Sequence, residues 1–402
     1  INVMRSSTLY ILFLLMHMVL PARGQLFINE VMAVNTSGAY NPAIQEPGDW
    51  IEIYNGTGYM VELGGYSLSD DPDDPFKWQF PYETYVSPGR YHLVWADGSN
   101  LTQYGSHTNF KLGVEGETLF LTNRSGELCD SMSYPAMFEN ISYGFSLDGS
   151  ALYFKDPSPG AANNNGSGFL YAGNVAFDPP PAVYSAPREV HITSDSPGGT
   201  MRYTLDGSTP GPDDSIYTGP LVLAENTVIR ARLFLEGFEP GAISTATYIF
   251  SEGFTLPVVS ISTDPLNFFD DQTGIYVEGT HGVPGYCMDI PVNWNMDWER
   301  PLSFEYFDLA GERRLQFDGG TKIHGGCSRT APMKPLAIFA RSRYGSTSIN
   351  YPFFTQKDVD SFKGLILRNS GNDNQYTDFR DGAIQATVGP VMNVDVQAFE
   401  PV

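Results

Sequence analysis

The sequence predicts a mainly β, multidomain protein. Its 402 residues include 41 glycines and 29 prolines, and this content, with few long helical patterns, favours short strands joined by turns. Runs in which apolar and polar residues alternate recur along the chain and are separated by Gly, Asp, Pro and Asn. That pattern is typical of antiparallel β-sandwiches, and the length allows two or three domains.

Residues 1–24 have the layout of a secretory signal peptide. Met4 and Arg5 precede an apolar run from Leu9 to Leu20, and the small-residue stretch Ala22–Gly24 follows. A run of about a dozen apolar residues is too short for a membrane span, which needs about 20. We therefore expect a secreted, extracellular or cell-surface protein with no membrane span in this segment; a buried amino-terminal helix is the alternative.

The chain is strongly acidic, with a formal net charge of −23. This charge argues against nucleic acid and anionic membranes as partners. One segment has the opposite charge. From Arg313 to Arg343 the sequence contains seven basic residues and a single acid, Asp318, which gives a local charge of +6. The basic members of this island are Arg313, Arg314, Lys322, Arg329, Lys334, Arg341 and Arg343.

The first domain is expected over residues 25–164, as an immunoglobulin-like β-sandwich. Its blocks Ile28–Val31, Asp49–Asn55, Leu63–Asp70 and Phe110–Leu112, with Gly116 and Glu117, resemble the lamin-tail domain. That resemblance implies a spacer or recognition module without catalysis.

Two polar features of the first domain leave a choice of interpretation. Glu30, Glu52 and Asn55 are expected to pair with backbone groups at strand ends, because buried polar groups need partners. The acidic run Asp70–Asp74 offers oxygen ligands for calcium, but it lacks the spacing of a known calcium loop, and a solvated turn is the alternative.

A linker over residues 165–175 leads to a second sandwich over residues 176–250. The segments Tyr203–Pro210 and Ile216–Pro220 resemble the chitobiase/β-hexosaminidase carboxy-terminal module, a fibronectin type III-like fold. Asp206–Gly207 supplies a hairpin turn. Tyr203 and Tyr217 could face a sugar, whereas packing in the core or a turn is the expected role of aromatic residues at alternating positions.

The third domain is expected over residues 254–402. Several blocks resemble the CotH kinase family, named for a spore-coat protein. They are Leu256–Asp264, Thr273–Val277, Trp298–Pro301, Ile323–Arg329, Ala340–Arg341, Tyr344–Gly345, Leu367–Asp373 and Phe379–Gly382. The resemblance implies the α+β amino-terminal part of an atypical kinase-like fold, with ATP and a divalent metal (Mg or Mn) as cofactors. It also places the catalytic acids in a lobe beyond Val402, so we assign no catalytic or metal residue and expect this incomplete domain to be inactive.

The candidate nucleotide site lies around a glycine turn. A strand through Lys322 leads to this turn, whose amides can approach an anion, and a lysine at the start of the next strand can contact phosphates. Each member also has a structural alternative, such as closing a hairpin or satisfying a loop. The assigned residues are Lys334, Arg329, His324, Gly325, Gly326 and Asp381, the last on a helix expected to begin at Thr377.

The three cysteines, Cys129, Cys287 and Cys327, have no metal-ligand spacing. A bridge between Cys287 and Cys327 is compatible with an exported protein and is left open.

Three functions remain at this point. The intact protein is an exported kinase that phosphorylates protein Ser or Thr, a non-catalytic surface or adhesion protein, or an accessory part of a polysaccharide-degrading system. A protein, cell-surface or polysaccharide partner fits any of them.

Overall fold

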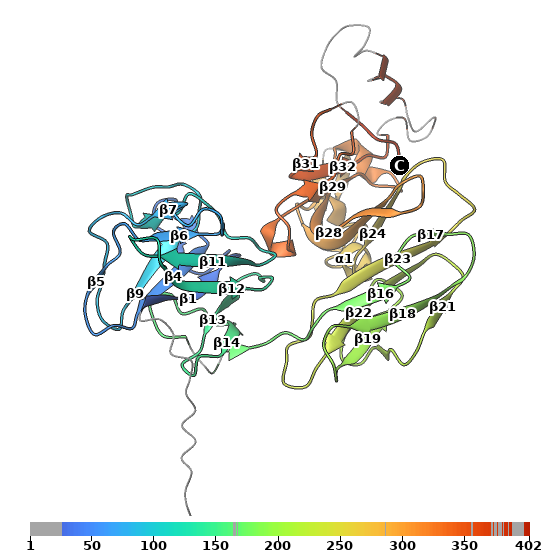
Figure 1. Cartoon of the computed structure of the whole chain (residues 1–402). Helices are drawn as coiled ribbons and strands as arrows, with labels where there is room; N and C mark the ends of the chain where they lie inside the picture. The colour runs from blue at the N-terminus through green and yellow to red at the C-terminus, as the bar shows by residue number, and fades with distance from the viewer. Residues whose placement is uncertain are drawn as a thin grey trace, which may run out of the picture.

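The computed structural model describes residues 26–402 except 164, 165, 167, 286, 355, 356, 371, 372, 374, 375, 377–379, 381, 385 and 388–397. The expected signal peptide lies outside the described residues. No helix in the described part of the chain is long and apolar enough to cross a membrane. The structure is mainly β and is built from several separate sheets (Figure 1).

The first domain is a sandwich of two sheets. The larger sheet has the order β10-β9-β4-β1-β13-β14-β15, and the smaller has the order β12-β11-β6-β7. The larger comprises β1 (Leu26–Met32), β4 (Trp50–Asn55), β9 (Tyr91–Trp95), β10 (Ser106–His107), β13 (Ser142–Phe145), β14 (Ala151–Phe154) and β15 (Gly168–Phe169). The smaller comprises β6 (Ser67–Ser69), β7 (Trp78–Gln79), β11 (Glu117–Thr122) and β12 (Leu128–Tyr134).

The core of this sandwich lies between the two sheets. Ile28 and Ile53 from the larger sheet meet Leu68, Leu119 and Leu121 from the smaller one, and all five are fully buried. Two short two-stranded ribbons complete the domain. One pairs β2 (Tyr40–Asn41) with β3 (Glu46–Pro47), and the other pairs β5 (Val61–Glu62) with β8 (Tyr85–Val86).

Glu30, Glu52 and Asn55 of the first domain are paired, as predicted. Asn55 donates to the carbonyls of Tyr59 and Val86 at 2.9 and 2.8 Å. Glu30 and Glu52, opposite each other on β1 and β4, are both fully buried. Their partners include side chains as well as backbone groups, and several come from the segment Ser158–Asn163. That segment closes the domain, and β15, which falls within the expected linker, adds a strand to its larger sheet.

Glu30 and Glu52 accept hydrogen bonds from different parts of that closing segment. Ser158 Oγ donates to Glu30 at 3.1 Å, and the backbone amide of Gly160 donates to Glu52. Asn29 Nδ2 bridges the network, donating to Glu52 at 2.8 Å and to Asn163 Oδ1 at 3.0 Å. The two carboxylates therefore hold the end of the domain against its first strand.

The second domain is also a two-sheet sandwich, with the orders β16-β18-β21 and β17-β23-β22-β19-β20. Its longest strand shows why the alternating pattern predicted it: Ile229, Ala231 and Leu233 are buried while their neighbours are half-buried. The strands are β16 (Val175–Asp178), β17 (Val183–Tyr184), β18 (Arg188–Ser194), β19 (Thr200–Thr204), β20 (Ser215–Ile216), β21 (Leu221–Leu223), β22 (Thr227–Phe234) and β23 (Ser244–Phe250). Tyr203 and Tyr217 pack against the core, as expected.

The third domain is built on a five-stranded antiparallel sheet of order β24-β27-β28-β29-β32. Its strands are β24 (Val258–Ser262), β27 (Arg300–Phe307), β28 (Arg313–Ile323), β29 (Leu336–Phe339) and β32 (Gly364–Leu367). Two hairpins flank it, β25 (Val283–Gly285) with β26 (Met288–Val292), and β30 (Ile349–Asn350) with β31 (Ser361–Phe362). The helical segments with defined bounds are α1 (Pro265–Phe269), η1 (Asn293–Asn295), η2 (Cys327–Thr330) and η3 (Ser342–Tyr344), and the described residues between 380 and 387 are also helical.

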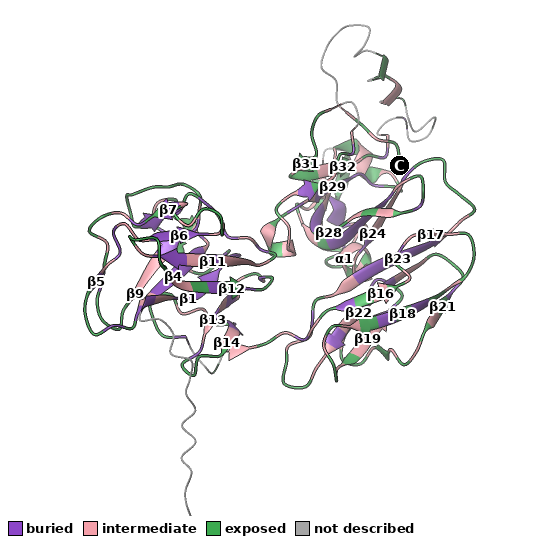
Figure 2. Ribbon diagram, in the orientation of Figure 1, coloured by how far each residue is buried: buried purple, intermediate pink, exposed green. Residues whose placement is uncertain are grey.

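The second and third domains are packed against each other, and Figure 2 shows buried residues in the strands of both. The amide of Val183 donates to the carbonyl of Gly311 at 2.8 Å, and Ala182 forms an isolated bridge with Glu312. A side chain at Gly311 would place its Cβ 2.8 Å from the Cβ of Val183. The two domains thus approach closely at the turn between β27 and β28.

Candidate functional site

Lys334 lies inside the third domain, and its side chain is only 7% exposed. Its ammonium nitrogen lies 3.7 Å from the ring centre of Trp294 and 5.6 Å from that of Tyr276. Nζ also donates to the carbonyls of Arg329 and Ala331 at 2.9 and 3.1 Å. Burial lowers the pKa of this lysine. Its contacts tie together the loop that follows the glycine turn.

The glycine turn follows β28, as the sequence predicts, and leads into η2. Gly325 has a φ of +85°, a conformation in which glycine is favoured. Arg329 folds back on the turn and donates from Nε to the Gly325 carbonyl at 2.8 Å, while Gly326 is exposed. His324 is also exposed, and its amide donates to the Pro335 carbonyl at 2.8 Å.

A disulfide between Cys287 and Cys327 anchors this turn to the β25–β26 hairpin, with the two Cα atoms 5.1 Å apart. The bridge, left open by the sequence, is thus present, and Cys129 remains free. Gly325, Gly326 and Arg329 line a small pocket of about 180 Å³ beside the disulfide. Asp381, with Thr377, lies outside the described residues.

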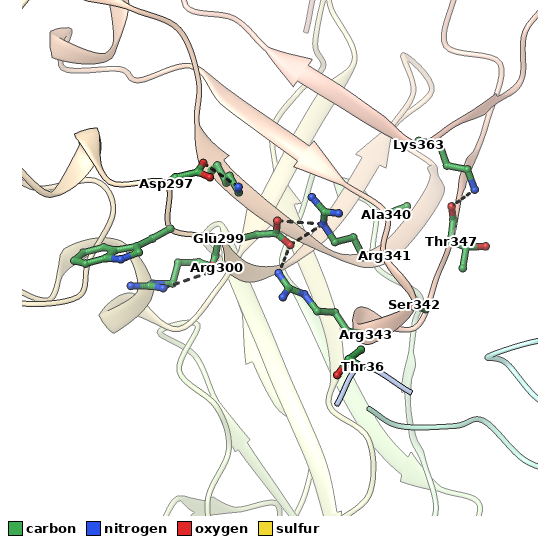
Figure 3. Close-up of a pocket in the computed structure, with 12 residues that line it drawn as sticks. Thr36, Asp297, Glu299, Arg300, Ala340, Arg341, Ser342, Arg343, Thr347 and Lys363 are labelled. Carbon is green, nitrogen blue, oxygen red and sulfur yellow. Dashed lines mark hydrogen bonds and ion pairs between the residues drawn. The ribbon is translucent and has the colours of Figure 1, made fainter. Parts of the chain in front are cut away.

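A larger hollow, of about 770 Å³, opens on another part of the same domain (Figure 3). We call it the basic hollow. Its lining residues come from the start of β27 and the residues just before it, the end of β28, the segment around η3 and the residue between β31 and β32, with one residue from the first domain. They are Thr36, Asp297, Trp298, Glu299, Arg300, Lys322, Ala340, Arg341, Ser342, Arg343, Thr347 and Lys363.

Glu299 organises the arginines of the basic hollow. Its carboxylate accepts from Arg341 Nε at 3.0 and 3.1 Å, and Arg343 Nη2 also donates to it. Only 8% of the Glu299 side chain is exposed, whereas those of the two arginines are 46% and 36% exposed. The carboxylate therefore lies beneath the two guanidinium groups, which leaves part of each cation facing solvent.

Aromatic rings and a glycine fix this arrangement. Arg341 lies over the ring of Phe339 and Arg343 over that of Tyr344, each at 4.8 Å. A Cβ at Gly320 would contact Glu299 and would lie 2.6 Å from Tyr344 Cε2, so only a glycine leaves room for both side chains. Burial raises the pKa of Tyr344 to about 12, so its hydroxyl stays neutral.

The other cations line the rim. Lys322 Nζ pairs with Asp297 at 2.9 Å, and Lys363 Nζ donates to the Thr347 carbonyl at 2.7 Å. Arg300 lies over the ring of Trp298 at 5.1 Å. Thr36, in a loop of the first domain, lies near Arg343 (Figure 3).

Five cations and two carboxylates give this lining a charge of +3, in a chain whose net charge is −23. Partly exposed guanidinium and ammonium groups are suited to phosphate or carboxylate ligands. The basic island of the sequence is divided by the fold: three of its members, Lys322, Arg341 and Arg343, line the basic hollow. Arg313 and Arg314 pair with acids elsewhere, and Arg329 and Lys334 form the glycine-turn loop.

Sequence reasoning missed two of the lining cations, Arg300 and Lys363. Arg300 belongs to the block Trp298–Pro301, which carried a resemblance without an assigned role. Lys363 has no local signal, because only the pairing of β29 with β32 brings it to this rim.

The acidic run Asp70–Asp74 does not form a cluster of calcium ligands among the described residues. Asp70 pairs with Lys77, and Asp71 accepts from the amide of Asp73 at 2.9 Å. Within the described ranges, no three His, Cys, Asp or Glu residues are grouped as metal ligands.

Two segments are similar to known families. Residues 20–136 match the lamin tail domain, and residues 179–245 match the chitobiase/β-hexosaminidase C-terminal domain. No curated protein matches the chain. Together with the sheets described above, these matches indicate a modular protein with two sandwich-type domains ahead of the domain that bears the basic hollow.

Proposed function

We propose that this chain belongs to a secreted or cell-surface modular protein in which two β-sandwiches attach or space a third, phosphate-binding domain. On this proposal, the third domain is CotH-like and binds the phosphates of ATP in the basic hollow. The intact protein then transfers the terminal phosphate to a Ser or Thr of an acceptor protein. The observation that carries the proposal is the charge of +3 gathered around one hollow of a strongly acidic chain.

The lining of the basic hollow fits a polyphosphate. Its volume of about 770 Å³ lies within the range of small-molecule sites, about 300–1,000 Å³. Arg341 and Arg343 are held in place by Glu299, so little side-chain freedom is lost when they bind a ligand. Lys322, Arg300 and Lys363 would contact the remaining phosphate oxygens. Both carboxylates of the lining are paired with cations, Asp297 with Lys322 and Glu299 with Arg341 and Arg343, and no step is assigned to a divalent cation.

The placement of Lys334 favours a second candidate, a non-catalytic surface or adhesion protein. The lysine expected to contact phosphates is enclosed by Trp294 and two backbone carbonyls, an arrangement that stabilises a loop. On this view the third domain is a scaffold, and the basic hollow binds an anionic group of a partner. An accessory role beside a polysaccharide-degrading enzyme belongs to the same class, because the sandwiches would then supply the binding.

Calorimetric titration of the folded chain with ATP, AMP and tripolyphosphate tests the phosphate site. We expect ATP and tripolyphosphate to bind more tightly than AMP, and Arg341→Ala with Arg343→Ala to weaken ATP binding at least tenfold. Arg90→Ala, an exposed arginine of the first domain, is the matched control and should leave the affinity unchanged.

Lys334→Ala separates the two placements of the site. Unchanged ATP affinity in that variant, with loss in the arginine variants, assigns binding to the basic hollow. Loss of binding only in Lys334→Ala would return the site to the glycine turn. Transfer of labelled phosphate to an acceptor protein by the full-length product would support the kinase, and binding without transfer would support the scaffold.

A further inference from the structure

Three strongly exposed tyrosines of the first domain lie on the β5–β8 ribbon or next to it in sequence. Tyr82 is 80% exposed, Tyr59 63% and Tyr85 52%, and Met60 beside them is 59% exposed. Large exposed apolar groups that lie together are uncommon on a soluble domain unless they bind something. We call this face the tyrosine surface and define it as Tyr59, Met60, Glu62, Tyr82, Tyr85 and Arg124.

Strand pairing places two of these side chains on the same face. Val61 pairs with Val86 and both are buried, so the next pair, Glu62 and Tyr85, projects outward. Tyr82 precedes β8 and lies against Gly64, where a Cβ would meet the Tyr82 Cα at 2.8 Å.

The backbone beneath the tyrosine surface is held in place before any ligand binds. The carbonyl of Tyr59 accepts from Asn55 Nδ2 at 2.9 Å and from Thr57 Oγ1 at 2.7 Å. Arg124 donates to the carbonyls of Gly64 and Glu62. Buried Asn55 therefore fixes the backbone position of Tyr59, an exposed aromatic residue.

The charges of this face are nearly balanced. Arg124 Nη2 pairs with Glu62 at 2.8 Å, and this contact lowers the pKa of the Glu62 carboxyl. Glu83, beside Tyr82, is also exposed, so Glu62, Arg124 and Glu83 together have a formal charge of −1. Nothing here attracts an anionic polymer, while guanidinium and carboxylate groups at the centre can bond to neutral hydroxyl groups.

We propose that the tyrosine surface binds a neutral polysaccharide, whose sugar rings stack on the tyrosine rings while its hydroxyls bond to Glu62 and Arg124. Tyrosine suits this role because its ring is apolar and its hydroxyl remains wet. The β5 strand lies at the end of the first domain that is furthest from the other two (Figure 1), where a long polymer has access.

Native affinity electrophoresis tests this with the whole folded chain in gels that contain hydroxyethylcellulose, glucomannan, laminarin or, as the anionic comparison, alginate. We expect retardation by at least one neutral polymer and none by alginate. Tyr82→Ala and Tyr85→Ala should each weaken that binding about tenfold, which corresponds to about 1.4 kcal/mol. Tyr40→Ala, another exposed tyrosine on the β2–β3 ribbon, is the matched control and should bind as the parent does.

Tyr82→Phe keeps the ring and removes the hydroxyl, so it should retain most of the binding. Loss of binding in Tyr82→Phe equal to that in Tyr82→Ala would overturn stacking. Migration unchanged in every neutral gel, or retardation by alginate alone, would overturn the polysaccharide proposal and favour a protein partner for this face.

Discussion

The carboxylate of Glu305 in β27 accepts a hydrogen bond from the backbone amide of Thr247 in β23, at 3.3 Å. Glu305 belongs to the third domain and Thr247 to the second, and Glu305 is fully buried between them. Thr247 Oγ1 also donates to this carboxylate, and Arg313 Nη1 pairs with it at 2.8 Å. The second and third domains therefore share a buried charged contact and should unfold together.

Glu305→Ala should lower the free energy of unfolding by about 3 kcal/mol, because breaking a buried ion pair leaves its partners unsatisfied. It should also separate one cooperative transition into two, measurable by urea denaturation followed by circular dichroism. Asp297→Ala removes an exposed ion pair with Lys322 and serves as the control, with a loss below about 1 kcal/mol. A single unchanged transition in Glu305→Ala would show that the contact does not couple the domains.

The buried carboxyl of Glu52 should make the free energy of unfolding depend on pH. Burial raises the pKa of its carboxyl to about 8, and the nearby Glu30 carboxylate adds to that shift. Because the folded pKa lies above the unfolded value of about 4.5, the stabilising contribution is complete below pH 4.5 and is lost as the pH rises to 8. Glu52→Gln should remove a slope of up to about 1.4 kcal/mol per pH unit across that window.

The measurement is the difference in unfolding free energy between Glu52→Gln and the parent at several pH values, in which titrating groups that do not interact with Glu52 cancel. His92 acts in the opposite direction, since burial lowers its pKa to about 4 and its contribution is lost as the pH falls from 6.5. A difference that stays constant between pH 4.5 and 8 would contradict the assigned shift of Glu52.

Gly320→Ala should disturb the basic hollow without changing its charge. The added Cβ would contact Glu299 and Tyr344, so the carboxylate would no longer hold Arg341 and Arg343 in their present positions. We expect a five- to tenfold loss of tripolyphosphate affinity by calorimetry. Gly219→Ala, where a Cβ meets nothing within 4 Å, is the control. Equal affinities in the two variants would indicate that Glu299 does not organise the site.

Reduction of the Cys287–Cys327 bridge should destabilise the third domain. The bridge closes a separation of 40 residues, for which loop-closure entropy gives about 4 kcal/mol. Alkylation of the unreduced, denatured chain should modify Cys129 alone, whereas alkylation after reduction should modify three cysteines in the intact mass. Three modified cysteines without reduction would contradict the bridge.

The sequence predicted features that depend on local pattern. Alternation predicted the buried face of β22, and glycine chemistry predicted the turn at Gly325. It also predicted that Asn55 would be paired to backbone groups, since a buried amide has few alternatives.

What the sequence could not predict is which distant segments meet. The division of the basic island depends on pairing between β28, β29 and β32, and only that pairing brings Lys363 beside Arg341. Lys334 was expected at an anion site because of its position before a strand. Its enclosure by Trp294 depends on η1, 40 residues earlier in the chain, whose location no local pattern reveals.

The position of β1 in the middle of the larger sheet affects the order of events during synthesis. β1 is translated first, yet Glu30 bonds to Ser142, 112 residues later, and to Ser158, 128 residues later. At about 5–20 residues per second, the ribosome supplies these partners roughly 6 to 25 seconds after β1. The nascent first domain must therefore wait, with its central strand incomplete and accessible to chaperones, until almost all of its length has emerged.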